Sequence, residues 1–265
     1  MKKLILSLLT MASLAFAANA VTYLNVKTDR GNVVIYDVDS VVEVYYDQLI
    51  TVSGKVGNYT YVDLGLPSGT KWATYNVGAT RRTQRGDYFA WGETKPKGVY
   101  YKENYKWCMD TGEIDRWGYP IYKYTKYCAN SEYGTVDNKT VLEAEDDAAT
   151  ANWGKEWRMP TVEEIEELID ACYWKWVYNV DNTGTNGHLG TSKTNGASIF
   201  LPANSPGDMD PNSQGDHGSY WSSSLYEDDP DDAYTIHSTV DYINDKISSY
   251  HRSRSVGRCV RAVLR

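Results

Sequence analysis

The chain has 265 residues, and its 27 Lys and Arg against 35 Asp and Glu give a formal net charge of −8. An acidic surface repels phosphate backbones, which argues against nucleic acid as a partner. The aromatic residues are 23 Tyr and 9 Trp against 3 Phe, a balance that suits recognition surfaces as well as half-buried packing.

The first twenty residues form a predicted signal peptide. Lys2 and Lys3 precede the apolar run 4–17, and small residues within 15–20 offer a cleavage site before Val21. No Cys follows this site, so no lipid anchor is expected. Because no later stretch approaches about 20 apolar residues, no membrane insertion is expected either. These features predict a secreted, cell-surface or periplasmic protein.

Residues 21–50 are predicted to form a small β unit. Three strand-like segments, 23–27, 33–36 and 41–46, are separated by turn signals such as 29–32. The arrangement resembles a short β leader found before many Bacteroidetes surface domains. Such short strands cannot hold a core alone, so we expect the unit to pack on the main domain or to pair with another chain through a free strand edge.

The main domain is predicted to span residues 59–265. Residues 61–73 are typical of two strands joined by a Pro-Gly turn. The Tyr-rich segment 98–138 is irregular and predicts long loops.

Two helices are predicted next. Residues 143–151 have a helix-forming composition with Ala at four positions. In the second helix, Thr161 and Glu164 form a capping box directly after Pro160. Its apolar stripe comprises Val162, Ile165, Leu168 and Ile169, and its carboxylates at 163, 164, 166 and 167 are expected to face water.

The acidic residues of the first helix have two interpretations. They are Glu143, Glu145, Asp146 and Asp147. We expect one of them to form a structural ion pair with Arg158, and metal binding or acid–base chemistry is the alternative.

Six short strands are predicted after Cys172, over residues 173–178, 198–202, 221–224, 233–237, 246–250 and 258–263. Two helices, several short strands and long loops together predict an α+β fold.

Four cysteines in an exported chain predict disulfides, and three connectivities are possible. Cys108 and Cys128 flank one turn-rich segment, whereas Cys172 follows the second helix and Cys259 lies in the last strand. The preferred pairing is therefore Cys108–Cys128 with Cys172–Cys259. A redox or catalytic cysteine is the alternative.

Three phrases in the second half of the chain carry a family resemblance. They are Trp157-Arg158-Met159-Pro160-Thr161, Tyr220-Trp221-Ser222-Ser223-Ser224 and Ser255-Val256-Gly257-Arg258-Cys259-Val260-Arg261. In this order they resemble the Fibrobacter succinogenes major paralogous domain, and the resemblance covers residues from about 60 to 265. It implies an extracytoplasmic protein with a C-type-lectin-like domain of two helices, several short antiparallel strands and long loops. The same fold is shared by formylglycine-generating enzymes and by the variable proteins of diversity-generating retroelements.

The resemblance also implies where a ligand would bind. In retroelement-diversified relatives the variable ligand-binding residues lie in a matching C-terminal stretch. The corresponding candidates here are Tyr226, Tyr234, His237, Asp241, Tyr242, Tyr250, His251 and Arg252. An ordinary polar hairpin is the alternative. Formylglycine-generating relatives need active-site cysteines close together near this end, and only Cys259 lies there.

The sequence also contains a possible calcium loop. Its oxygen ligands alternate, at Asp208, Asp210, Asn212 and Asp216. Ser213 and Ser219 replace the Gly and Glu of an EF-hand loop, so a solvated turn is the other interpretation. The histidines lack zinc-site spacing, and no phosphate or dinucleotide motif occurs.

The sequence thus predicts an exported, non-catalytic binding protein that recognises a glycan or a protein through a loop-built face rich in Tyr, Trp and Asp. One alternative is a structural or adhesin component of the cell surface that assembles through its N-terminal strands. Another is an enzyme acting on envelope polysaccharide, which would need two carboxylates, or a Cys with its base, in one pocket.

Overall fold

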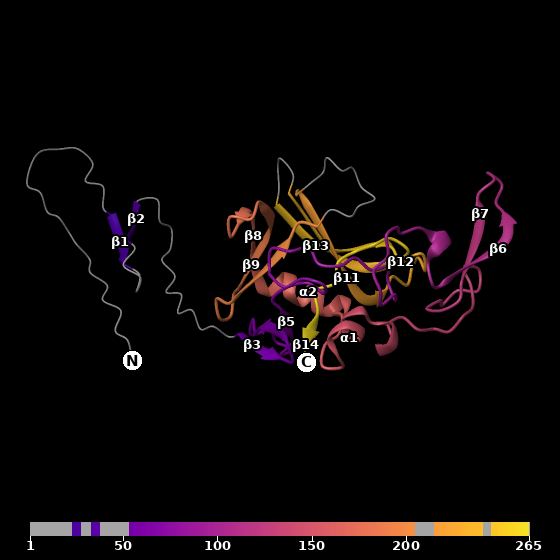
Figure 1. Cartoon of the computed structure of the whole chain (residues 1–265), viewed down its shortest axis with the longest axis horizontal. Helices are drawn as coiled ribbons and strands as arrows, with labels where there is room; N and C mark the ends of the chain where they lie inside the picture. Colours follow the sequence, from indigo (N-terminus) through magenta and orange to yellow (C-terminus); the bar gives the residue numbers. More distant parts are fainter. Residues whose placement is uncertain (1–22, 28–32, 38–52, 205–214, 241–244, 265) are drawn as a thin grey trace, which may run out of the picture. The chain divides into compact units, whose positions relative to one another are not determined.

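A computed structural model describes residues 23–27, 33–37, 53–204, 215–240 and 245–264. The chain divides into two compact units, Met1–Gln48 and Leu49–Arg265. The first unit contains one antiparallel pair, β1 (Tyr23–Lys27) and β2 (Val33–Asp37), at the two segments where strands are predicted (Figure 1). The predicted signal peptide and the predicted strand 41–46 lie outside the described residues.

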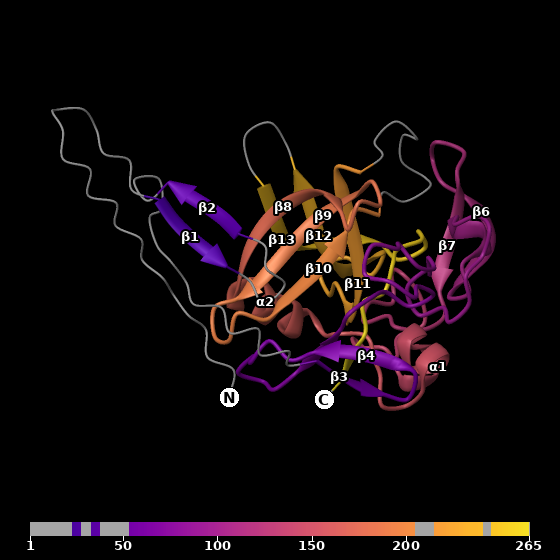
Figure 2. The ribbon, with the colours of Figure 1, turned by 60° about the vertical axis from the view of Figure 1, so that its left-hand side comes forward.

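The second unit is an α+β structure of two helices and several small antiparallel sheets. Two of these sheets have three strands each, in the orders β10-β9-β8 and β11-β12-β13. Their strands are β8 (Cys172–Val180), β9 (Thr185–Ser192), β10 (Ser198–Pro202), β11 (His217–Leu225), β12 (Asp232–Val240) and β13 (Asp245–Ser253). The two sheets lie side by side (Figure 2), and Nδ1 of His188 lies 2.7 Å from the hydroxyl of Ser238 between them.

A third sheet brings the two ends of this unit together. Its order is β14-β5-β4-β3, from β3 (Ser53–Val56), β4 (Tyr59–Val62), β5 (Lys71–Ala73) and β14 (Val263–Leu264). The predicted last strand, 258–263, is mostly not part of a sheet, and only the two residues of β14 are a strand. The reason is that Arg258 and Val260 exchange backbone hydrogen bonds with the irregular segment 77–89 instead of with a strand.

The segment 98–138, predicted as long loops, contains a short 3₁₀ turn, η2 (Lys102–Asn104), and a hairpin of β6 (Cys108–Ile114) and β7 (Pro120–Tyr124). The Asp115 carboxylate closes the hairpin turn, because its Oδ1 accepts the amides of Trp117 (2.8 Å) and Tyr119 (2.9 Å). This local Asx-type bonding makes a defined turn where composition indicates only irregular chain.

Both predicted helical regions are helical. The first is shorter than predicted and is split into η3 (Ala144–Asp146) and α1 (Ala148–Trp153), because the Asp147 side chain caps α1 by accepting the amide of Thr150. The second, α2 (Val162–Ala171), has the predicted capping box of Thr161 and Glu164. Ile165 and Leu168 of its apolar stripe are buried against the β11-β12-β13 sheet.

Removing the cap should weaken α2. We expect Thr161→Ala to lower the free energy of unfolding by about 1 kcal/mol, because the amide of Glu164 loses its acceptor. Urea unfolding followed by circular dichroism measures this loss. Thr135→Ala, at an exposed loop position, is the matched control. Equal stability of the two variants would contradict the capping role.

Two predictions about charged groups are wrong. Glu164 does not face water, and Arg158 does not pair with the first helix. Instead Arg158 donates to both carboxylate oxygens of buried Glu164 at 2.6 Å, and Thr70 donates to the same carboxylate at 2.8 Å. The capping box draws Glu164 back toward the helix start, which places its carboxylate beside Arg158.

All four cysteines are free, so the predicted disulfides Cys108–Cys128 and Cys172–Cys259 are not formed in this structure. Two of the thiols point to backbone carbonyl groups instead. The Sγ of Cys128 lies 3.1 Å from the oxygen of Asn130, and that of Cys259 lies 3.1 Å from the oxygen of Arg85.

The three sequence motifs that carry the family resemblance contribute residues to the hydrophobic core. Trp157, Trp221 and Val260 belong to one buried apolar cluster, and Tyr220 and Cys259 belong to a second one with the α2 stripe. Within the described ranges, no helix has the length and apolar character needed to cross a membrane.

Candidate functional site

Six of the eight predicted ligand-binding residues lie on or beside the β11-β12-β13 sheet. Tyr226 directly follows β11, Tyr234 and His237 are on β12, and Tyr250, His251 and Arg252 are on β13. The antiparallel register pairs Tyr234 with His251. The other two, Asp241 and Tyr242, lie outside the described residues.

Four of these side chains form what we call the aromatic stack, composed of Tyr226, Tyr234, Tyr250 and His251. The His251 ring lies parallel to Tyr226 at 4.0 Å and to Tyr250 at 4.9 Å between centroids. Tyr234 meets Tyr226 edge-on at 5.3 Å. The Asp232 carboxylate fixes His251, at 2.6 Å from Nδ1. Because Tyr226 and His251 use their faces on one another, the stack stabilises the outer strand β13, while Tyr250 remains 43% exposed.

The pleat of β13 places Lys246, Ser248, Tyr250 and Arg252 on one face. The Arg252 guanidinium lies 4.3 Å from the Tyr250 ring centre, and the His237 ring lies 5.7 Å from it. Burial lowers the pKa of His237 to about 4, together with the positive charges of Arg252, His217, Arg258 and Lys246. We call the surface formed by Lys246, Arg252, His217 and His237 the cationic face; Arg258 is buried.

The other face of the same strands is acidic. Burial raises the pKa of Tyr234, and the negative charges of Asp228, Glu166, Glu227 and Glu163 add to the effect. Glu166 also accepts a hydrogen bond from the hydroxyl of Ser249 at 3.0 Å. The structure therefore divides the predicted recognition residues between two surfaces of opposite charge. The sequence analysis did not predict Lys246, His217 or Arg258 as ligand-binding residues. Lys246 could have been found, because it lies an even number of residues before Arg252 and therefore on the same face of a strand.

Two buried polar atoms on β11 have no hydrogen-bond partner in the described part of the chain. They are the hydroxyl oxygen of Ser219 and Nε2 of His217. Ser219 pairs across the sheet with His237, so its hydroxyl belongs to the same side as the cationic face. A buried polar group without a partner is a common sign of a bound water or ligand.

The predicted calcium loop is described only at Asp216, and Asp208, Asp210 and Asn212 lie outside the described residues. Asp216 is exposed, and its carboxylate lies 2.7 Å from Nδ1 of His217. This carboxylate therefore neutralises one of the basic groups of the cationic face.

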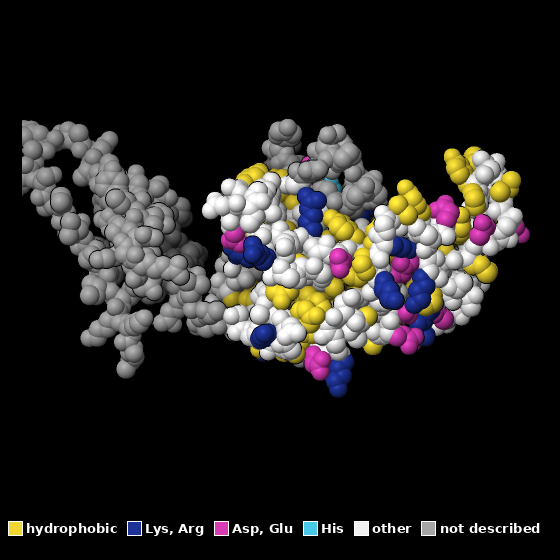
Figure 3. Space-filling view, viewed as in Figure 1, with side chains coloured by type: hydrophobic (Ala, Val, Ile, Leu, Met, Phe, Trp, Pro, Cys, Tyr) yellow, Lys and Arg dark blue, Asp and Glu magenta, His cyan; other side chains and the backbone are white. Residues whose placement is uncertain are grey.

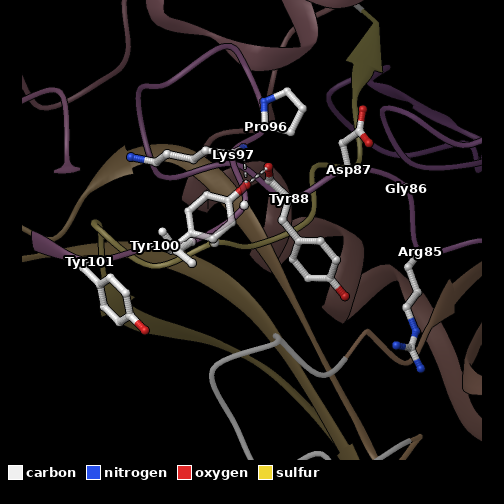
Figure 4. A pocket seen from close by; sticks show the side chains of 11 residues that line it. Arg85, Gly86, Asp87, Tyr88, Pro96, Lys97, Tyr100 and Tyr101 are labelled. Atoms are coloured by element: carbon white, nitrogen blue, oxygen red, sulfur yellow. Dashed lines mark hydrogen bonds between the residues drawn. The ribbon is translucent and has the colours of Figure 1, made fainter.

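A cavity of about 510 Å³ opens between residues 85–88 and 96–101 (Figure 4). Tyr100 is fixed there, since its hydroxyl donates to the carbonyl oxygen of Tyr88 and accepts the amide of Lys97 at 3.0 Å. Gly257 forms part of the wall, and a Cβ at this position would lie 2.7 Å from the Tyr100 ring. Arg85 is exposed at the rim. No sequence pattern predicted this cavity, because its two walls are separate irregular segments.

The carboxylates before α1 do not form an open acid–base or metal site. Oxygens of Glu143, Glu145 and Asp146 lie within 4.8 Å of one another. However, the Lys126 ammonium group lies 2.5, 3.5 and 2.6 Å from these three carboxylates, respectively. Lys106 and Lys139 add further ion pairs at 2.9 and 2.7 Å. The cluster is a neutralised ion network that joins the β6–β7 region to η3.

Burial raises the pKa of the Cys259 thiol to about 12. The thiol is therefore protonated at neutral pH, which disfavours a nucleophilic role.

Comparisons of the chain with protein-family models, with curated proteins and with solved structures found no match. What defines the class of this protein is thus its α+β architecture.

Proposed function

We propose that the chain is an exported, non-catalytic binding protein whose second unit is a C-type-lectin-like domain, and that its cationic face binds a glycan with acidic groups. The observation that carries the proposal is the Arg252 guanidinium over the Tyr250 ring, on the same face of β13 as Lys246, with the unpartnered Ser219 hydroxyl on the same side of the sheet. The three family-like phrases support the choice of domain.

The chemistry of this face suits oxyanions. An Arg guanidinium can bond a carboxylate or a sulfate through two N–H groups. Here Arg252 is held over the Tyr250 ring, which limits the side-chain freedom that binding would otherwise remove. The unpartnered Ser219 hydroxyl and His217 Nε2 would add further hydrogen bonds.

A charge-removing substitution tests the proposal. We expect Arg252→Gln to weaken binding of a sulfated or uronic-acid oligosaccharide about tenfold, the usual effect of losing one charged hydrogen bond. Isothermal titration of acidic and uncharged oligosaccharides, at low and high salt, measures the effect. Lys155→Gln, which removes an exposed positive charge in the turn after α1, is the control.

Other outcomes of the same titration would point elsewhere. Equal binding of acidic oligosaccharides by Arg252→Gln and by the wild type would contradict the proposal. Binding lost with chelator would assign the interaction to calcium near Asp216. A structural or adhesin role remains the alternative proposal. The β1–β2 sheet would serve it, since each of its strands has an edge without a partner strand among the described residues.

A further inference from the structure

A second candidate site is a groove beside the β6–β7 hairpin, with a volume of about 530 Å³. It is lined by the hairpin turn, β7, the segment after β7, η2 and the β11–β12 loop. Its main side chains are Tyr119, Tyr122, Tyr133, Glu103, Asp229 and Asp231. None of these belongs to the cationic face. Figure 3 shows apolar side chains gathered along the same hairpin, and Tyr119 and Trp117 near its turn are 69% and 67% exposed.

The floor of the groove is rigid. Buried Tyr124 donates its hydroxyl to the Asp231 carboxylate, which also accepts Lys102 Nζ at 2.5 Å. The Arg254 guanidinium lies 3.8 Å from the Tyr124 ring centre and donates to the carbonyl oxygens of Tyr127 (2.7 Å) and Lys126 (2.9 Å). This network ties β7 to the β11–β12 loop, so the two walls are positioned before any ligand arrives.

The tyrosine rings of the groove walls are open to solvent. Tyr119 is 69% and Tyr133 is 39% exposed. Across the described ranges, neither these rings nor that of Tyr122 packs against another aromatic ring. The backbone that carries Tyr133 is fixed, because its carbonyl oxygen accepts the amide of Tyr124 at 2.8 Å. Flat, open rings are what the C–H face of a sugar needs for stacking.

Two carboxylates in the groove are available to a ligand. Asp229 accepts the amide of Asp231 at 3.0 Å through Oδ1, and Glu103 lies beside the Tyr122 hydroxyl. Neither carboxylate forms an ion pair with a described residue. Carboxylate oxygens that are held near open rings can accept hydrogen bonds from sugar hydroxyls.

We propose that this groove binds an uncharged oligosaccharide, with its rings stacked on Tyr119 and Tyr133 and its hydroxyls bonded to Asp229 and Glu103. Anionic sugars would be repelled by Asp229 and Glu103, whereas the charge of Asp231 is neutralised by Lys102. A cationic peptide is disfavoured because Lys102 and Arg254 already occupy the Tyr124 ring, at 5.4 and 3.8 Å. The site is independent of the acidic-glycan surface and goes beyond it.

The test uses the full mature chain and a panel of uncharged hexasaccharides of glucose, mannose and xylose, measured by isothermal titration. We expect at least one of them to bind, Tyr133→Ala to weaken that binding about five- to tenfold, and Asp229→Asn to weaken it about threefold or more. Tyr178→Ala, at an exposed tyrosine of β8, is the control. Melting temperatures would establish that the variants remain folded.

Several results would overturn the proposal. One is that no hexasaccharide of the panel binds, and another is that binding survives both Tyr133→Ala and Tyr119→Ala. Binding of oligolysine in the groove, lost in Asp229→Asn, would assign it to a basic peptide. Binding of acidic sugars is expected to depend on Arg252 and binding of uncharged sugars on Tyr133, so failure of one proposal can be told from failure of the other.

Discussion

Replacing Arg261 with Met should lower the free energy of unfolding by about 3–5 kcal/mol. Arg261 is fully buried, and its guanidinium donates to the Asn76 side chain at 2.7 Å and to the carbonyl oxygens of Ala73 (3.2 Å) and Phe200 (3.0 Å). A Met fills much of the space but leaves all three acceptors buried without donors. Each such loss typically costs about 1–3 kcal/mol.

Part of this loss is offset, because the buried charge is itself unfavourable. Burial lowers the pKa of Arg261 to about 10, and Met does not carry that desolvation cost. Urea unfolding of Arg261→Met against Arg81→Met, which removes an exposed Arg, separates the buried contacts from the change of residue type. A stability within about 1 kcal/mol of the control would show that the three acceptors do not depend on Arg261.

Replacing Glu164 with Gln should cost about 3 kcal/mol at neutral pH, because it leaves the partly buried Arg158 guanidinium without its carboxylate. Gln keeps the size of the side chain and can still bond Thr70 and the Thr161 amide, so the loss reports mainly on the ion pair. Glu113→Gln, at an exposed position of β6, is the matched control. Unfolding by urea at pH 7 gives the difference.

The same pair of variants predicts a pH dependence. Burial by itself would raise the pKa of Glu164, but hydrogen bonds from Arg158, the Thr161 amide and Thr70 outweigh it and lower the pKa. A lowered pKa in the folded state contributes stability above the unfolded-state pKa, and this contribution is lost as the pH falls through the folded-state value.

The wild type should therefore lose more stability than Glu164→Gln on acidification from neutral pH to below about 4. Parallel acid titrations of unfolding free energy measure the difference, and Glu113→Gln should follow the wild type. Identical acid profiles for all three proteins would mean that the Glu164 pKa is not lowered by folding.

Local patterns predicted the elements that depend on neighbouring residues. The capping box of Thr161 and Glu164 needs only residues three apart, and α2 begins where the sequence places it. Alternating residues likewise placed β8, and short strand-like segments placed β10 and β12. The boundaries of α1 were less well predicted, because the Asp147 cap competes with the helix-forming residues before it.

The sequence alone determined the α+β class, α2 and most strands, because periodicity and capping are properties of adjacent residues. Only the tertiary structure decided which charges meet, since Glu164 and Thr70 are distant in the chain. It also decided that Tyr226 and His251 use their faces on one another while Tyr119 and Tyr133 stay open. Such surfaces arise from segments that no local pattern links, because their proximity results from packing of the whole unit.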